Sequence, residues 1–135
     1  MKFSDVTPNL IVSDVERSLA FYRDVLGFSV TATVPEASPL VFAMMQRDSV
    51  SVFLNSVESV KEYPSLASRA IGGTNTMFVV IEADDIKGGI DALFASISPK
   101  ARLFMGLKDQ FYGMREFGIE DPDGYVIFFA QRIAG

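Results

Sequence analysis

Carboxylates and aromatic rings are the groups with which this chain of 135 residues could do chemistry, because it contains no histidine and no cysteine. Those two residue types are the usual general acid–base groups, nucleophiles and metal ligands. Glu82, Glu116 and Asp109 are the carboxylates whose positions suit a cleft, and Glu82 alternates with Phe78 along a predicted strand. They could act as acid and base, or attract a cationic ligand. Each could equally be a solvated charge or the ion-pair partner of a nearby arginine.

The aromatic residues are numerous, with 12 phenylalanines and 4 tyrosines. In a predicted strand over 50–55, Ser51 and Phe53 point to one side, and Val52 and Leu54 point to the other, which we expect to pack on a helix. The rings expected to line an apolar cleft are Phe42, Phe53, Phe78, Phe104, Phe111, Tyr112, Phe117 and Phe128. Such a cleft would stack a planar ligand. The same rings could instead fill a closed core, because apolar pockets and apolar cores look alike in sequence.

A few polar residues complete the candidate site. Asn9 and Thr7 could orient a ligand by hydrogen bonds, or could satisfy neighbouring backbone groups. Arg115, next to Glu116, is a further candidate for ligand binding. Four aspartates are assigned instead to helix caps and turns, because local bonding to the backbone explains them. These are Asp14, Asp85, Asp121 and Asp123.

Composition narrows the possible partners and location. The net charge is −5 and the pI about 4.6. An acidic chain repels phosphates, so nucleic acid is not an expected partner, whereas a cationic small molecule would be favoured. The N-terminal residues lack the basic and apolar regions of a signal peptide. Since no apolar run approaches ~18 residues, we expect no membrane segment and a cytoplasmic location.

The chain contains an internal repeat, and this repeat predicts the strands and helices that position the candidate residues. Shifting residues 7–27 by 71 places Asp14 on Asp85, so each copy has an apolar strand, a capping aspartate and an amphipathic helix. The first helix carries apolar residues at helical spacing and ends at Gly27. The second is predicted over 85–97. The predicted strands are 9–13, 28–34, 40–46, 50–55, 77–83, about 101–107, 114–120 and 125–131.

These elements predict an α+β fold of two βαβββ modules in tandem, forming a curled mixed sheet around a cleft. Module one covers about 1–56, an irregular linker about 57–74 and module two about 75–135, together making a single domain. A tight turn over 121–124 joins the last two strands, because proline presets φ and glycine accepts a positive φ.

The order of these motifs resembles the vicinal oxygen chelate superfamily, which includes glyoxalases, bleomycin resistance proteins and dioxygenases. The resemblance covers nearly the whole chain. The residues that carry it are Leu10, Val12, Asp14, Phe21, Tyr22, Leu26, Gly27, Asp85, Tyr112, Gly113, Arg115, Glu116 and the turn 121–124. It implies paired modules whose sheets curl around a cleft, and a homodimer.

The resemblance also implies where metal-using relatives hold their ligands. Counting back from the helix aspartates gives Thr7 and Phe78, and counting on from the turn aspartates gives Phe53 and Phe128, with Ser51 as an alternative in the first module. Phenyl rings offer no lone pair to a metal, so metal-dependent activities are not carried over. The closest match is the branch that resembles metal-free bleomycin resistance proteins, and we expect no cofactor.

The sequence thus leads to three functional hypotheses. The first is sequestration of a small aromatic, cationic compound without chemistry, as in antibiotic resistance. The second is a lyase or isomerase that uses carboxylates such as Glu82 and Glu116. The third is a dimeric scaffold with a sealed core. The residues predicted to bind a ligand are Asn9, Phe42, Ser51, Phe53, Phe78, Glu82, Phe104, Tyr112, Arg115 and Phe128.

Overall fold

The computed structural model describes residues 1–133 and divides the chain into two compact units, Met1–Ile71 and a second that begins at Gly72. The boundary lies inside the stretch 57–74 that was expected to be a linker. Residues 134–135, the end of the predicted second module, lie outside the described residues. Each unit holds one four-stranded mixed sheet, so the prediction of an α+β fold with two similar modules is confirmed.

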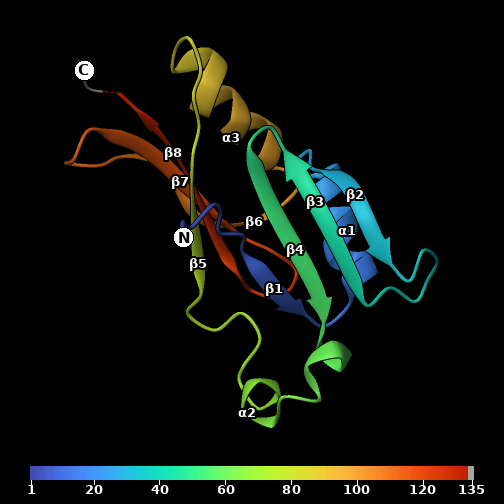
Figure 1. Cartoon of the computed structure of the whole chain (residues 1–135). Helices are drawn as coiled ribbons and strands as arrows, with labels where there is room; N and C mark the ends of the chain where they lie inside the picture. Colours follow the sequence, from blue (N-terminus) through green and yellow to red (C-terminus); the bar gives the residue numbers. More distant parts are fainter. Residues whose placement is uncertain (134–135) are drawn as a thin grey trace. The chain divides into compact units, whose positions relative to one another are not determined.

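The first unit is a four-stranded sheet with one helix on one face (Figure 1). Its strand order is β1-β4-β3-β2, with β1 parallel to β4 and the other pairs antiparallel. The elements are β1 (Asn9–Val12), α1 (Val15–Asp24), β2 (Ser29–Val34), β3 (Phe42–Arg47) and β4 (Val50–Ser56). Alternation along β4 buries Val52 and Leu54, and α1 packs against this strand, as predicted.

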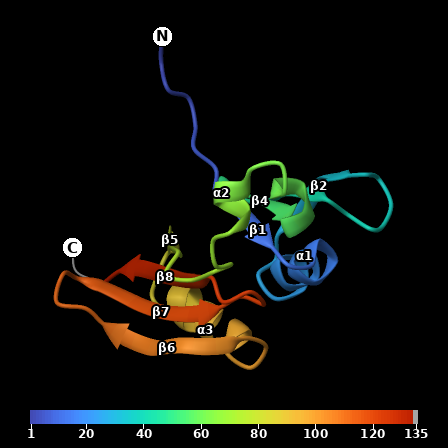
Figure 2. The ribbon, with the colours of Figure 1, turned by 90° about the horizontal axis from the view of Figure 1, so that it is seen from below.

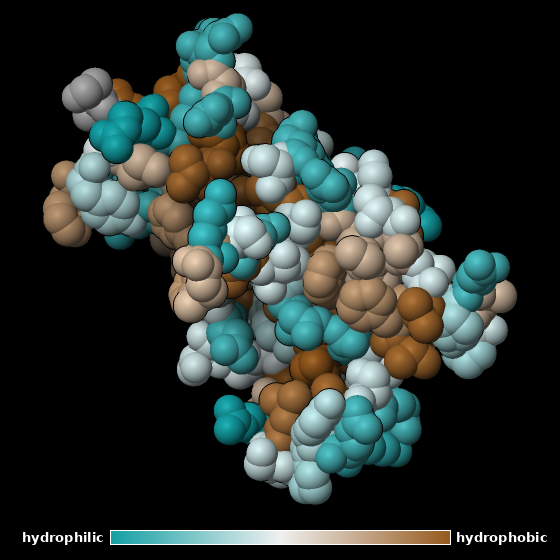
Figure 3. Space-filling model, in the orientation of Figure 1, coloured by the Kyte–Doolittle hydropathy of each residue, from teal (hydrophilic) through white to brown (hydrophobic). Residues whose placement is uncertain are grey.

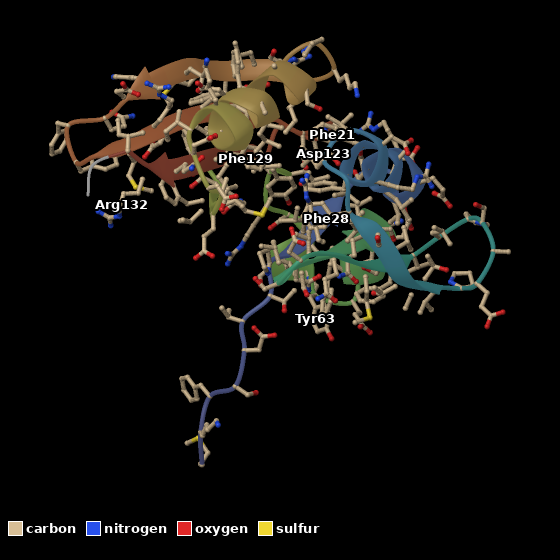
Figure 4. All side chains as sticks on the ribbon, turned by 90° about the horizontal axis from the view of Figure 1, so that it is seen from above. Phe21, Phe28, Tyr63, Asp123, Phe129 and Arg132 are labelled. Carbon is tan, nitrogen blue, oxygen red and sulfur yellow. The ribbon has the colours of Figure 1, made fainter. Side chains whose placement is uncertain are left out.

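Helix α1 begins and ends as its sequence predicts. The Asp14 carboxylate accepts a hydrogen bond from the Arg17 N–H at 3.0 Å, which satisfies one of the free N–H groups of the first turn. The chain leaves the helix through Gly27, whose φ of 74° is a left-handed conformation that favours glycine. The next residue, Phe28, lies beside the helix (Figure 4) and packs edge-to-face on Tyr22, with ring centroids 5.8 Å apart.

The stretch after β4 is more regular than predicted. It contains a 3-10 turn, η1 (Val57–Val60), and a short helix, α2 (Pro64–Ala67). The Ser56 hydroxyl accepts from the Ser59 N–H and so caps η1, and proline at the first position suits the start of α2. The sequence shows only isolated caps here, without the apolar periodicity that predicts a helix.

The second unit repeats the architecture, with strand order β5-β8-β7-β6 and α3 on one face (Figure 2). Its elements are β5 (Thr76–Val80), the π-turn η2 (Lys87–Asp91), α3 (Ala92–Ile97), β6 (Arg102–Asp109), β7 (Met114–Glu120) and β8 (Val126–Arg132). Phe117 is fully buried on the helix side, between the rings of Phe94 and Phe129 at 5.2 and 5.1 Å. This corrects its assignment to a cleft.

The predicted helix 85–97 is broken, and a buried glutamine explains the break. Gly89 leaves helical geometry, with φ −101° and ψ −109°. A Cβ at this position would lie 2.1 Å from Oε1 of Gln131, so the side chain of Gln131 occupies the space. Gln131 accepts from the Ile90 N–H at 2.8 Å and donates to the Asp85 carbonyl at 3.2 Å. Asp85 itself accepts from the Gly88 N–H, as its predicted capping role requires.

The two copies do not superpose with one constant offset. Asn9 pairs with Phe53 in the first sheet, and Phe78 pairs with Phe128 in the second. Thr7, which an offset of 71 places on Phe78, precedes β1, whereas Phe78 lies within β5. The connection to the helix is longer after β5 than after β1, so the offset between the capping aspartates does not align the two strands end to end.

The turn between β7 and β8 is held by Asp121 as predicted. Its carboxylate accepts from the N–H groups of Asp123 and Tyr125, both at 2.9 Å, and Gly124 has a φ of 87°. Among the described residues, no helix is both long enough and apolar enough to span a membrane.

Candidate functional site

The face of the first sheet opposite α1 gathers four of the predicted ligand-binding residues, and we call it the N-terminal face. Asn9, Ser51, Phe53 and Phe42 lie on neighbouring strands with their side chains alternating away from the buried core. Phe42 and Phe53 pack edge-to-face at 5.4 Å, and the Asn9 side chain accepts a hydrogen bond from Asn55. Figure 3 shows hydrophobic side chains exposed over β3 and β4.

The face of the second sheet opposite α3 gathers three phenylalanines, and we call it the aromatic face. Phe78 and Phe128 are cross-strand partners, and the rings of Phe104 and Phe128 meet edge-to-face at 5.7 Å. Phe78 is 54% exposed and Phe104 is 53% exposed, so these rings do not fill a closed core. Val80 extends the face along β5 and is also exposed.

A glycine at the centre of the aromatic face lets these rings close over the sheet. Gly118 lies opposite Phe128, and a Cβ added to it would lie 3.1 Å from the Phe128 ring and 3.3 Å from the Phe104 ring. Both distances are shorter than ordinary van der Waals contact. Glycine therefore permits a close approach that any other residue would oppose.

A buried carboxylate and a tyrosine lie at the end of the same face. Glu116 is 3% exposed and stands two residues before Gly118 on β7, on the same side of the strand. The Tyr112 hydroxyl donates to its Oε2 at 2.5 Å, and the Gln110 amide donates to its Oε1 at 3.3 Å. The hydrogen bond to Glu116 is the main cause that raises the pKa of Tyr112, because the neutral phenol is the donor.

Arg115 lies apart from the other predicted residues, because alternation on β7 sends it to the helix-covered side. Its guanidinium donates to both carboxylate oxygens of Asp109, at 2.6 and 3.1 Å, and to Asp91 at 3.1 Å. These hydrogen bonds from Arg115 hold the pKa of Asp109 below its usual range. Arg115 therefore joins the β6–β7 hairpin to the helical segment, and the geometry gives it a structural role.

Glu82 also lies apart, because β5 ends at Val80 and the predicted alternation does not reach it. Its side chain is exposed, and within residues 1–133 no hydrogen bond or ion pair joins it to Glu116. No observation therefore favours an acid–base pair of these two glutamates.

The paired positions of the first and last strand in each sheet also indicate whether a metal suits them. Asn9, Phe53, Phe78 and Phe128 supply one amide and three phenyl rings, which is not a donor set for a catalytic metal. Across residues 1–133, no three carboxylate side chains come together in a way that could hold an ion.

Sequence reasoning missed three contributors to these faces. Met44 lies opposite Phe53 on the N-terminal face, and strand alternation from Phe42 would have found it. The sequence carries no signal for Gly118 or Gln110. The role of Gly118 depends on rings from two other strands, and the role of Gln110 depends on how the β6–β7 hairpin folds.

Two comparisons with known proteins point to the same family. The sequence model of the Glyoxalase/Bleomycin resistance protein/Dioxygenase superfamily matches residues 5–129. A bleomycin resistance protein of Geobacillus stearothermophilus is 30% identical over 136 residues, which cover 93% of this chain and 95% of the relative.

Two solved structures have the same fold at lower identity. A glyoxalase/bleomycin resistance protein/dioxygenase from Nocardioides has a TM-score of 0.78 at 18% identity, covering 100% of this chain and 87% of the other. TnmS3, an antibiotic binding protein from Streptomyces sp. CB03234, has a TM-score of 0.69 at 24% identity, covering 98% of each chain. With its two mixed sheets and the match over 5–129, the chain belongs to the glyoxalase/bleomycin resistance protein/dioxygenase superfamily.

Proposed function

We propose that this protein binds a small aromatic compound and releases it unchanged, as a sequestering protein of the bleomycin-resistance type. The observation that carries the proposal is the aromatic face, where Phe104 and Phe128 pack over Gly118, Phe78 lies beside Phe128, and the rings of Phe78 and Phe104 are more than half exposed. Large apolar groups gathered on a surface commonly mark a place where a ligand binds. Rings held at these angles offer both faces and edges to a planar compound.

The family supports the same proposal. The relative at 30% identity, which spans nearly the whole chain, is named for resistance to bleomycin. Sequestration needs no catalytic group: a protein that binds a drug lowers its free concentration by mass action alone. The side chains of Asn9, Phe53, Phe78 and Phe128 offer ring contacts and one amide, which suit the binding of an aromatic compound.

We propose that the N-terminal face is a separate and weaker binding surface within the first unit. There Phe42 and Phe53 would offer apolar contacts, and the amide of Asn9 and hydroxyl of Ser51 would offer hydrogen bonds. This face is less exposed at its rings, since both phenylalanines are half-buried. We therefore expect variants here to weaken binding less than variants on the aromatic face.

The proposal is tested by titrating the purified chain with bleomycin and measuring heat by isothermal titration calorimetry. We expect saturable binding, and mass spectrometry should recover the ligand unaltered. Phe78→Ala and Phe104→Ala should each weaken binding by about 2- to 12-fold, which corresponds to about 0.5–1.5 kcal/mol per ring contact. Neither change should reduce stability much, because both rings are more than half exposed.

Phe3→Ala is the matched control, because this ring is 92% exposed and lies before β1. It should leave the affinity within about 2-fold of the parent, as for surface substitutions generally. The proposal fails if bleomycin shows no saturable binding, or if the two face variants bind it as tightly as Phe3→Ala does. A chemically altered ligand would point instead to an enzyme.

We also propose that the chain forms a homodimer, as the family resemblance implies. Light scattering coupled to size-exclusion chromatography should then give twice the chain mass of 14.8 kDa. A mass equal to one chain at micromolar concentration would contradict this.

A further inference from the structure

Within residues 1–133, the carboxylate at the end of the aromatic face, Glu116, has no ion-pair partner. Glu116 is 3% exposed, and its partners in the described chain are two neutral donors, Tyr112 and Gln110. Burying a carboxylate is costly unless opposite charge or several hydrogen bonds compensate it. Other carboxylates of this unit form ion pairs: Asp91 and Asp109 both pair with Arg115.

Two cations are near enough in the ladder to have paired with Glu116, and neither does. Lys108 is its cross-strand neighbour on β6, and Arg132 lies two residues beyond its other neighbour, Ala130, on β8. Both are exposed, and among residues 1–133 neither forms an ion pair with Glu116. Figure 4 shows Arg132 at the outer end of its strand.

Tyr112 covers Glu116, and its other side faces solvent. Tyr112 is 48% exposed and lies in the hairpin between β6 and β7, where Gly113 follows it with a φ of 84°. Its ring contacts Phe111, a residue that is 99% exposed. Rotation of Tyr112 away from Glu116 would thus break one hydrogen bond and move a side chain that is already about half exposed.

We propose that Tyr112 is a displaceable cover and that Glu116 receives the cationic group of an aromatic ligand bound on the aromatic face. This inference rests on the proposed function and names the ligand class: a planar aromatic compound with a protonated amine on a short arm. Glu116 and Gly118 are two residues apart on β7, or about 6.6 Å. The rings of Phe104 and Phe128 cover Gly118, so a ligand ring packed on the solvent side of those rings would extend its ammonium along β7 toward the carboxylate.

A matched pair of probes isolates the charge. We would measure the affinities of 2-(naphthalen-1-yl)ethylamine, which is cationic at neutral pH, and of 2-(naphthalen-1-yl)ethanol, which is neutral and of similar shape. The parent should prefer the amine by about 10-fold or more, as expected for a hydrogen bond between charged groups. Glu116→Gln should remove most of that preference.

Two further variants separate recognition from structural damage. Glu120→Gln removes the same charge four residues along β7, from a side chain that pairs with Arg102 at 3.3 Å, and should keep the preference for the amine. Tyr112→Phe keeps the ring but removes the hydrogen bond that holds it over the carboxylate, and should strengthen amine binding while Glu116 stays in place. A residue with only a structural role would not produce that gain.

The outcomes are distinct for the two proposals. Equal affinity of the parent for both probes, or weaker amine binding by Tyr112→Phe, overturns this inference and leaves the proposed function standing. Failure of both probes to bind the parent, together with failure of bleomycin, overturns the proposed function itself. If Glu116→Gln does not fold, the Tyr112→Phe result decides.

Discussion

Replacing Gly89 by alanine should destabilise the protein, although alanine is normally the better residue in a helix. The added Cβ would lie 2.1 Å from Oε1 of Gln131 and 2.8 Å from Cβ of Ala83. Both distances are below any that real Cβ contacts show. Gln131 would have to move, because it is 6% exposed and fills the space where the Cβ would be.

The magnitude follows from what that movement breaks. Displacing Gln131 leaves the buried Ile90 N–H without its acceptor, which costs about 1–3 kcal/mol. Overpacking costs about 1–3 kcal/mol more, and the helix propensity of alanine offsets none of it, because Gly89 does not have helical φ and ψ. We therefore expect the free energy of unfolding to fall by about 2–6 kcal/mol, which lowers Tm by roughly 6–30 °C for a chain of this length.

Urea unfolding followed by far-ultraviolet circular dichroism measures this change, with Gly88→Ala as the matched control. A Cβ on Gly88 would meet only Asp85 Oδ1, at 3.1 Å, on an exposed side chain. That variant should be neutral or up to about 1 kcal/mol more stable. If both variants prove equally stable, the argument that Gln131 forces the break in the helix is wrong.

Three further predictions follow from single contacts. Gly118→Ala should push apart the rings of the aromatic face and weaken bleomycin binding in calorimetry, with little loss of Tm because those rings can move toward solvent. The pKa of Tyr112 is raised by its bond to Glu116, so the stabilisation is complete below pH ~10 and is lost as pH rises through the folded-state pKa. Absorbance titration should show one late-ionising tyrosine that Tyr112→Phe removes. The Leu40 N–H holds the pKa of Glu16 below its usual value, so that stabilisation is present above pH ~4.5 and is lost on acidification. The stability difference between the parent and Glu16→Gln should accordingly shrink between pH 5 and pH 3.

The order of elements could be predicted because local signals mark each boundary. The Asp14 cap, the apolar stripe of the first helix and the turn at Asp121 depend on residues within a few positions of one another. Alternation along the strand likewise places Phe53 and Val52 on opposite faces. These patterns act over short distances along the chain, so the sequence alone reveals them.

The candidate site was only partly predictable, because its decisive contacts join distant segments. Alternation placed Phe78 and Phe128 on one face, but it could not show that β5 stops at Val80 and leaves Glu82 outside the sheet. It also could not show that Arg115 turns to the helical segment and binds Asp91. Both outcomes depend on register and on partners far along the chain.

The sequence by itself determined the family, the two-module α+β fold and the absence of histidine and cysteine chemistry, because these depend on residue types and on local patterns. Only the tertiary structure decided that Glu116 is buried under Tyr112 and that Gln131 breaks the second helix at Gly89. The physical reason is the same in both cases. A polar side chain removed from water bonds to whichever donors or acceptors the fold brings beside it, and the sequence does not state which those are.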